Sequence, residues 1–491
     1  MDNSKPLPPE KLNPAEEWAS WKPSGADPFD ARWAGHLYRR AGFGATPVEL
    51  QNAIRDGLDA TLERMFSNAK TPAKPAPIQN PTLPAGAIQI RVDWLQRMLS
   101  GSEPIRERLT FFWHNHFATS IAKIKDARLM QRQNDLIRKY ALGKFGPFLR
   151  EMSRDAAMLI WLDSNQNVKS HPNENFAREV MELFSLGVGN YTEKDVQDAA
   201  RAFTGWHVTN PQEPDPKYVF HSNDHDHGTK KILGQTGEWD GDDVIRILLE
   251  QPACSKFLVR KLYAFLIDEN VAPPDALIQP LARDLQKADY DVGVTVRTIL
   301  KSRHFYSAHA YRQKVKSPID YILGVARMLG TSSTGAIVMS PHQLIGSLEL
   351  QGQQLYQPPN VKGWEGGKAW LNTATVLARH NFGSAIANGM KELNLEALKS
   401  TGATFVVTSD PLPRILDMVR RAHKIDPEDL PEPVHVVDYL SYILLQDDLT
   451  PKASARMIAH LDTAGSNPND FRQCCRDVLA AILTLPEYQL N

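Results

Sequence analysis

The sequence predicts an all-α protein, a large irregular multi-helix domain with long, functional-looking loops and little or no strand. From Trp33 onward, apolar residues recur every three or four positions, which is the period of an amphipathic helix. Strand patterns are rare, and the β-branched run at 404–408 is one short candidate. Proline- and glycine-rich stretches separate the helical segments, at 71–85 and at 208–243. A loop as long as the second is usually either functional or disordered.

The composition is that of a globular protein with balanced charge. Of the 491 residues, 42% are hydrophobic and 23% are charged, and the formal net charge is -1. No overall field therefore attracts nucleic acid or anionic lipid. The basic stretch at 123–150 lacks interleaved aromatic residues, so we interpret it as a solvated helix face and expect no nucleic-acid partner. The three cysteines have no metal-type spacing.

The sequence also predicts a location and a division into segments. It contains no run of about 18 apolar residues, so no membrane span is expected. Its first residues lack a signal-peptide core, which indicates a cytoplasmic protein, or a periplasmic or exported one if a leader has been removed. We expect a proline-rich tail at 1–32, a main helical domain at 33–385, and a C-terminal helical extension packed on it at 386–491.

A helix is predicted at 173–187, with Asn173 as its N-cap and Gly187 at its C-terminal end. Phe176, Val180 and Phe184 belong to its apolar stripe, and Glu179 falls inside that stripe. A carboxylate in an apolar face requires a cation, a metal or several donors, or else it takes up a proton. A buried Glu–Arg or Glu–His link, a metal ligand and an acid–base residue all remain open.

Two further charged side chains of this helix lie outside the stripe. Glu182 lies at its edge, and Arg178 points roughly the other way. Arg178 is four residues from both Glu174 and Glu182, so it can pair with either.

A second helix, at 106–117, places His116 in the middle of an apolar face, while His114 falls to the side. A histidine in such a face is either a satisfied core residue or a ligand, and its partner must come from another helix. We expect Glu179 to be that partner and to lie within about 8 Å, because a carboxylate–histidine pair can orient a metal ligand or tune a base.

The loop that follows is rich in histidine and aspartate. Residues 224–227 are all aspartate or histidine, and His221 precedes them. A loop lets several such groups converge on a metal, and a solvated Asx-type turn is the alternative. A divalent metal held by His116, Glu179, His225 and Asp226 is the resulting hypothesis, with Lys230 available for an anionic partner.

These stretches resemble the domain-of-unknown-function 1800 family, an uncharacterised bacterial family. The resemblance spans about 33–488 and is carried by HLYRRAGFG at 36–44, RERLTFFWHNHF at 106–117 and the long segment 173–206. It continues with HDHGTKKILG at 225–234, PPNVKGWEGGKAWLNT at 358–373 and LTLPEYQ at 483–489. The motif positions that it implies are Asn115, His116, Asn173, Glu174, Asn175, Arg178, Glu179, Glu182, His225, Asp226 and Lys230.

The family resemblance implies a partner but no reaction. Its members resemble exported bacterial proteins, and many occur beside the domain-of-unknown-function 1501 family, which is similar to sulfatases and phosphatases. Two functions follow. The first is an enzyme, a metal-assisted hydrolase or lyase with Glu179, His116, Glu182 and Arg178 as catalytic residues. The alternative is a non-catalytic helical scaffold that binds a sulfatase- or phosphatase-like protein, with an exposed apolar patch near Trp364 and Trp370.

Overall fold

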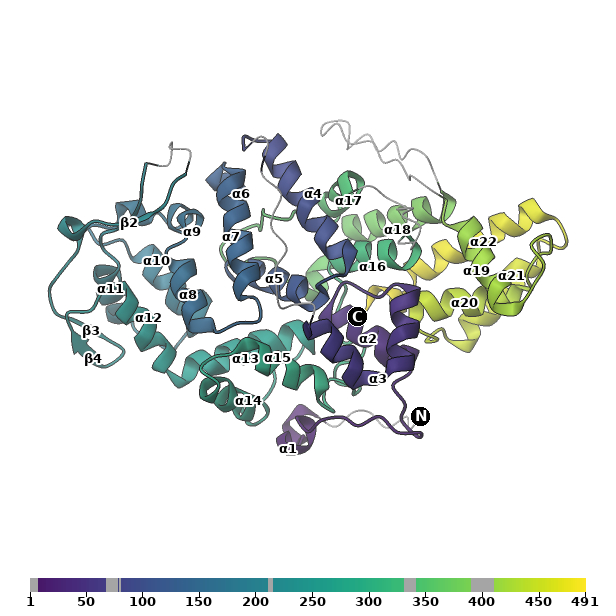
Figure 1. Ribbon diagram of the computed structural model, residues 1–491, viewed down its shortest axis with the longest axis horizontal. Coiled ribbons are helices and arrows are strands. Elements are labelled where there is room, and N and C mark those ends of the chain that lie inside the picture. Colours follow the sequence, from purple (N-terminus) through teal and green to yellow (C-terminus); the bar gives the residue numbers. More distant parts are fainter. Residues whose placement is uncertain (1–7, 68–77, 79–80, 211–214, 331–340, 390–409) are drawn as a thin grey trace.

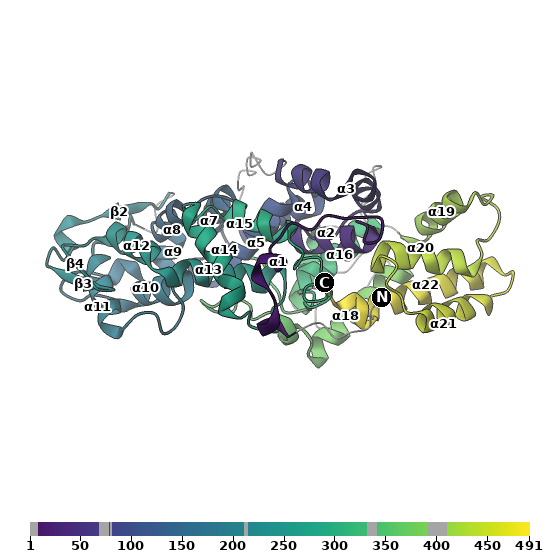
Figure 2. The same cartoon turned by 90° about the horizontal axis from the view of Figure 1, so that it is seen from below.

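The computed structural model shows an elongated helical molecule and confirms the predicted fold class (Figures 1 and 2). It describes residues 8–67, 78, 81–210, 215–330, 341–389 and 410–491. Within these residues the strands form two small antiparallel sheets of two strands each, β1–β2 and β3–β4. The strand candidate at 404–408 and most of the proline-rich stretch at 71–85 lie outside the described residues.

The first helices form the middle of the molecule. They are α1 (Pro14–Glu17), α2 (Ala31–Ala41), α3 (Pro47–Ser67), α4 (Ala85–Ser100), α5 (Pro104–His116), α6 (Ile121–Ile124) and α7 (Ala127–Tyr140). Helices α13 (Pro252–Leu266), α14 (Asp275–Lys287) and α15 (Val292–Lys301) return to this region and run below α5 and α7 in Figure 1.

One end of the long axis contains the sheets and the helices around them (Figure 1). These elements are α8 (Phe145–Ser153), α9 (Ala156–Trp161), α10 (Glu174–Glu179), a π-helix (Val180–Ser185), α11 (Glu193–Ala202), β1 (Trp206–Val208), β2 (Tyr218–Phe220), β3 (Lys230–Ile232), β4 (Gln235–Gly237) and α12 (Gly241–Glu250). The stretch 208–243, which was predicted to be an irregular loop, therefore contains the short strands β2, β3 and β4 and the first residues of α12.

The other end is all-helical, and α16 and α17 connect it to the middle (Figure 1). The elements are α16 (Pro318–Gly330), α17 (Pro341–Leu350), α18 (Thr373–Asn388), α19 (Leu412–His423), α20 (Pro433–Leu445), α21 (Pro451–Asp462) and α22 (Pro468–Thr484). Helix α22 packs along α18 and also touches α20 and α21. The expected boundary at 385/386 falls inside α18.

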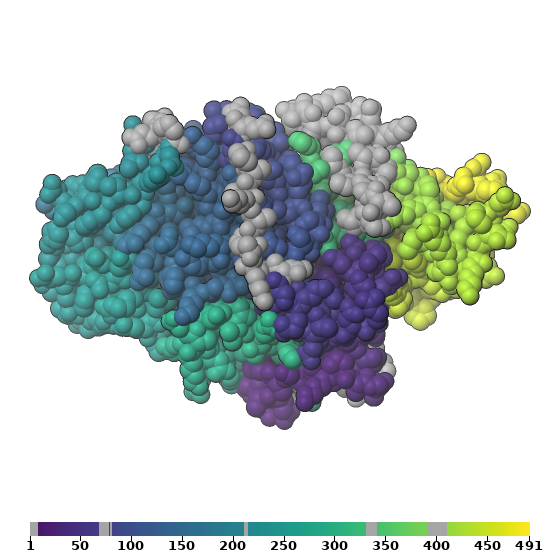
Figure 3. All heavy atoms as spheres, in the orientation of Figure 1, coloured from purple at the N-terminus to yellow at the C-terminus, as the bar shows by residue number. Residues whose placement is uncertain are grey.

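A continuous hydrophobic cluster joins these parts. Its buried side chains run from Trp21 in the N-terminal segment to Tyr488 near the C-terminal end. Trp21 stacks on Tyr306 with ring centroids 4.4 Å apart, so the N-terminal segment is docked on the middle of the molecule (Figure 3).

Several local signals form as the sequence predicts. The Asn173 side chain caps α10, and Thr192 and Asp195 form a reciprocal capping box at α11. Gly187 has a φ of 79° just beyond the π-helix, a conformation that glycine adopts without a Cβ penalty. The predicted helix at 173–187 is correct in position but widens into a π-helix after Glu179.

Candidate functional site

Helix α5 is buried on nearly every side, not only on the predicted apolar face. All its residues except Asn115 are buried, including Arg106, Glu107, Arg108 and both histidines. Buried charges need partners, and Glu107 finds two. It accepts hydrogen bonds from Arg138 Nε at 2.6 Å and from Trp94 Nε1 at 2.9 Å.

The two histidines of α5 are held by main-chain groups. His116 Nε2 lies 3.1 Å from the carbonyl oxygen of Phe184, and His114 Nε2 accepts a hydrogen bond from the Tyr356 amide at 3.2 Å. Burial lowers the pKa of each histidine to about 3, so both rings are neutral. The neutral His116 therefore donates to the Phe184 carbonyl, while its Nδ1 is buried without a hydrogen bond.

Glu179 does not pair with His116. Among the described residues, no hydrogen bond or ion pair joins the two side chains, and His116 contacts the same helical segment through the Phe184 carbonyl instead. The Glu179 side chain is half-buried. Burial and the neighbouring Glu182 carboxylate raise its pKa, and Lys362 opposes that rise. The predicted carboxylate–histidine pair is thus replaced by a main-chain contact.

The neighbouring charges of α10 connect it to α11. Arg178 donates to Glu174 at 3.0 Å, as its spacing predicts, and to Glu193 at 2.7 Å. Glu182 instead accepts a hydrogen bond from the Tyr191 hydroxyl at 2.8 Å. Arg178 and Glu182 therefore each have a protein partner.

The two asparagines at the start of α10 fix its entry. Asn173 Oδ1 accepts from the Asn175 amide at 3.0 Å, and its Nδ2 donates to the carbonyl of Asp163 at 3.2 Å. Asn175 Nδ2 donates to the Leu162 carbonyl at 3.2 Å. These contacts assign both motif residues a role in positioning the helix.

The motif residues of the histidine-rich loop bind nearby protein groups. His225 Nδ1 lies 2.9 Å from the Thr204 carbonyl, and Asp226 accepts hydrogen bonds from Arg201 at 2.7 and 3.2 Å. Lys230 is buried and donates to the carbonyl of Gly228 at 2.9 Å.

The structure does not bring the four predicted metal ligands together. In the part of the chain that it describes, two groups of three potential ligands have all their ligand atoms within 4.8 Å of one another. One contains His207, His221 and Asp224, and the other contains His460, Cys474 and Asp477. Neither includes His116, Glu179, His225 or Asp226. The physical reason is that His116, His225 and Asp226 are each held by other protein groups, at the Phe184 carbonyl, the Thr204 carbonyl and Arg201.

A cleft of about 400 Å³ opens beside α5, a volume typical of small-molecule sites. It lies between α5, α13, residues 314–320 and the loop 360–370. Its aromatic lining residues are Phe111, Phe112, Phe265, Trp364 and Trp370, and its ionisable ones are Arg108, His116, Lys261, Glu269, Lys314, Asp320, Lys362 and Glu365. The two motifs that contain Asn115–His116 and Trp364 therefore meet at this cleft.

Asn115 fastens the 360–370 loop to α5. Its Oδ1 accepts a hydrogen bond from the Trp364 amide at 2.7 Å, and its Nδ2 donates to the Trp364 carbonyl at 3.3 Å. Gly363 allows this approach, because a Cβ there would lie 2.2 Å from Asn115 Oδ1. One wall of the cleft is thus held by a two-bond clamp.

Two ion pairs and one unpaired lysine supply the charge of the less exposed part of the cleft, while Lys362 and Glu365 are exposed at its rim. Arg108 pairs with Asp320, and Lys314 Nζ lies 2.7 Å from Glu269 Oε2. Burial raises the pKa of Asp320, but the guanidinium of Arg108 outweighs it and holds that pKa below its usual value. Burial lowers the pKa of Lys314 to about 8.

Lys261 has no such partner. It makes no hydrogen bond or ion pair with any described residue, and its ammonium lies 5.4 Å from the centre of the Phe257 ring. Burial alone lowers the pKa of Lys261. The cleft therefore contains one positive charge that no described carboxylate balances.

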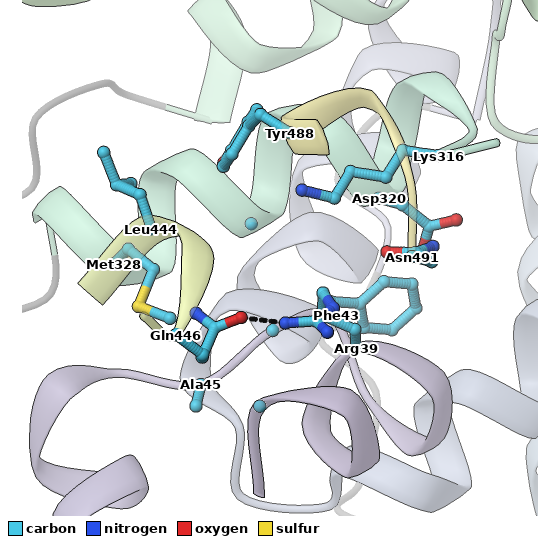
Figure 4. A pocket seen from close by; sticks show the side chains of 13 residues that line it. Arg39, Phe43, Ala45, Lys316, Asp320, Met328, Leu444, Gln446, Tyr488 and Asn491 are labelled. Atoms are coloured by element: carbon cyan, nitrogen blue, oxygen red, sulfur yellow. Dashed lines mark hydrogen bonds between the residues drawn. The ribbon is translucent and has the colours of Figure 1, made fainter. Parts of the chain in front are cut away.

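A smaller cavity behind the cleft adds further cationic groups (Figure 4). It shares Asp320 with the cleft and is also lined by Arg39 and Lys316. Arg39 bonds to Gln446, and the Lys316 ammonium lies 3.5 Å from the centre of the Tyr488 ring. Burial lowers the pKa of Lys316 well below its usual value, and the nearby Arg39 lowers it further. Basic side chains therefore outnumber carboxylates in the combined lining of the cleft and this cavity.

The sequence analysis missed the charged residues of the cleft. Lys261 lies four residues from both Phe257 and Phe265, so a helical wheel of α13 would have placed it on an apolar stripe, as it did for Glu179. The Arg108–Asp320 and Lys314–Glu269 pairs gave no such signal, because they join residues that are 212 and 45 positions apart in the sequence.

Comparison with known proteins identifies one matching family. A family described as protein of unknown function (DUF1800) matches residues 36–490, nearly the whole chain. The chain belongs to the DUF1800 family. No curated protein and no solved structure matches it. None of the described helices of this DUF1800 member is both long and apolar enough to cross a membrane.

Proposed function

We propose that this DUF1800 protein is an enzyme of the lyase type that acts on a small organic anion in the cleft beside α5. The observation that carries the proposal is Lys261, a half-buried lysine without a carboxylate partner among the described residues. A bound anion would supply the missing negative charge, and the aromatic walls suit an apolar or ring-bearing carbon skeleton.

The cationic groups of the cleft suit a carboxylate or phosphate. Arg108 and Lys314 are buried, and each is paired with one carboxylate. Asp320 is the partner of Arg108, and Glu269 is the partner of Lys314. With Lys261 added, the buried lining has a surplus of positive charge. Charge-assisted hydrogen bonds in such a water-poor site are stronger than between neutral groups.

The lowered pKa of Lys261 suits it to act as a general base. In its protonated form Lys261 would balance the charge of the anion, and in its deprotonated form it would remove a proton from a carbon next to a carbonyl group of that anion. The C–H bond breaks, an N–H bond forms on Lys261, and the electron pair moves to the carbonyl oxygen as an enolate. The enolate pair then forms a C=C bond to the adjacent carbon, whose bond to the leaving group breaks. The leaving group departs with that electron pair and takes up the proton from Lys261. The positive charges of Arg108 and Lys314 would stabilise the enolate.

Proton abstraction is measured without knowing the natural substrate. Pyruvate, 2-oxobutyrate and phenylpyruvate carry a carboxylate and an acidic C–H, and uptake of deuterium from D₂O at carbon 3 is followed by proton NMR. We expect exchange with the wild-type protein to exceed that with Lys261→Met. Lys256→Met is the matched control, because Lys256 lies on the same helix and pairs with Asp275. Equal exchange in wild type and Lys261→Met would contradict the proposal.

The metal-assisted version of the enzyme has less support. Its four predicted ligands, His116, Glu179, His225 and Asp226, form no group of neighbouring ligand atoms in the described residues. Three of the four have main-chain or side-chain partners of their own.

A second candidate function is the scaffold, and one observation favours it. Trp364 and Trp370 are buried, but Leu371, Val376 and Leu377, at the start of α18, are 39%, 50% and 57% exposed. Exposed apolar residues that gather in one place can mark a protein interface. A sulfatase- or phosphatase-like protein of the domain-of-unknown-function 1501 family is the partner to test. Val376→Asp with Leu377→Asp would abolish its binding, whereas Lys261→Met would leave that binding intact.

A further inference from the structure

Three metal-ligating side chains converge beside the β1–β2 sheet, at the end of the molecule away from α19–α22 (Figure 1). His207 Nε2 lies 3.2 Å from Asp224 Oδ2, and His221 Nδ1 lies 3.5 Å from the same oxygen. The two imidazole rings have centroids 4.9 Å apart. None of the three lines the cleft beside α5.

The backbone holds these side chains in place. In the β1–β2 register His207 lies opposite Val219, and His221 follows Val219 by two residues, so the two histidine side chains project from the same face of the sheet. The His221 amide donates to the Gly205 carbonyl at 2.8 Å, and the Asp224 amide donates to the His221 carbonyl at 3.0 Å. Gly205 has a φ of 83°, and a Cβ there would lie 2.6 Å from the His221 carbonyl oxygen.

A contact from a separate segment fixes the turn that contains Asp224. The Lys169 amide donates to the Asp224 carbonyl at 2.7 Å. The three side chains are therefore positioned by main-chain hydrogen bonds from two parts of the chain, which favours a preorganised site over a freely moving loop.

The environment of His207 indicates that a ligand binds here. It is 7% exposed, and its Nε2 has no properly directed hydrogen bond, although it faces Asp224. A buried ring nitrogen that faces a carboxylate without a well-directed hydrogen bond is uncommon in a folded protein. The adjacent Val208 amide donates to Asn165 Oδ1 at 2.7 Å, which fixes the backbone of β1 next to the ring.

We propose that His207, His221 and Asp224 form a binding site for a divalent transition-metal ion, of which Zn²⁺ fits best. Two imidazole nitrogens and one carboxylate oxygen are ligands that Zn²⁺ prefers over Mg²⁺ or Ca²⁺, which select oxygen. Because the side chains of His221 and Asp224 are 52% and 40% exposed, water reaches the remaining coordination position. Three protein ligands with one open position is the arrangement of a reactive metal site rather than of a closed structural one.

The neighbouring histidines of the loop are not part of this set. His225 is bonded to the Thr204 carbonyl, and Asp226 is paired with Arg201. The sequence thus indicated metal binding by this loop, but the proposed ligands are His221 and Asp224 rather than His225 and Asp226, and His207 from β1 is the third. The site is independent of the proposed chemistry at Lys261, and either can fail without the other.

The test is titration of the tag-free, chelator-treated full chain with ZnCl₂ by isothermal calorimetry. Cys474→Ser is introduced throughout, because His460, Cys474 and Asp477 form the other group of potential ligands. We expect one Zn²⁺ per chain at the remaining site and no detectable heat from MgCl₂ or CaCl₂. His221→Ala should weaken Zn²⁺ binding at least tenfold, and His207→Ala should abolish it.

The controls separate this site from general histidine binding. His227→Ala alters an exposed histidine of the same loop and should leave the affinity unchanged. His221 is itself exposed, so His221→Ala should fold normally even if His207→Ala does not. Absence of Zn²⁺ binding in the Cys474→Ser protein, or an affinity that His221→Ala and Asp224→Asn leave unchanged, would overturn the proposal.

Discussion

Removal of the Asn115 amide should release the 360–370 loop from α5. Asn115→Ala deletes the hydrogen bonds at 2.7 and 3.3 Å and leaves the Trp364 amide without its acceptor. Each net hydrogen bond contributes about 1 kcal/mol, and the orphaned amide adds a desolvation cost, so the loop should lose about 2–3 kcal/mol of docking free energy. At about 1.4 kcal/mol for each factor of ten, the undocked population rises about 30- to 150-fold.

Hydrogen exchange measured by mass spectrometry on peptides that cover 360–370 is the assay. Faster exchange should be confined to this loop, and trypsin should cut faster at the exposed Lys362 and Lys368. Asn115→Asp keeps an oxygen acceptor for the Trp364 amide and should lose less protection. Unchanged exchange at Trp364 in Asn115→Ala would refute the clamp.

Three further predictions rest on single contacts. Gly363→Ala should displace the loop, because its Cβ would lie 2.2 Å from Asn115 Oδ1. Gly352→Ala is the control: this glycine has a φ of 82° and open space around it, so the substitution adds backbone strain only. The two variants are compared by the same exchange assay. Glu107→Gln removes the buried partner of Arg138 and leaves the more exposed Asp135 as its counter-charge. It should cost about 3 kcal/mol in urea unfolding, the lower end of the range for a broken buried pair, whereas Asp289→Asn, which breaks an exposed pair, should cost about 1 kcal/mol or less. His116 has an ordinary pKa of 6.5 in the unfolded chain and a pKa of about 3 in the folded one, so its contribution to the free energy of unfolding is complete above pH 6.5 and is lost as the pH falls toward 3. The variant His116→Gln should therefore lose less stability than the wild type between pH 7 and pH 5. An unchanged slope would contradict the assignment.

The sequence predicted those features that depend on local spacing. The helical fold, the Asn173 cap, the Thr192 capping box and the burial of His116 all follow from residues within a few turns of one another. Local rules also predicted the Arg178–Glu174 pair, which the structure confirms at 3.0 Å.

Contacts between distant segments were beyond such rules. The burial of His114 depends on the Tyr356 amide, and that of Arg108 depends on Asp320, so a helical wheel of α5 alone placed only one face in the core. The short strands were hidden for a similar reason, because each has three residues and is defined by its partner.

The predicted hydrogen-bond partner of His116 was of the wrong chemical type. A carboxylate was expected, and a main-chain carbonyl in the π-helix takes its place. A carbonyl that is left free by the wider turn carries no signature in the side-chain sequence. Periodicity thus predicted which side chains are buried but not which atoms satisfy them.

The most direct test of the central claim is the titration of Lys261 itself, followed by NMR after reductive ¹³C-methylation of the lysines, with Lys261→Arg to assign its signal. The account predicts a midpoint below those of the exposed lysines, and an upward shift when phenylpyruvate is added, because a bound anion stabilises the charged amine. A midpoint equal to that of the exposed lysines, unmoved by the anion, would contradict both the burial of Lys261 and its role in the cleft.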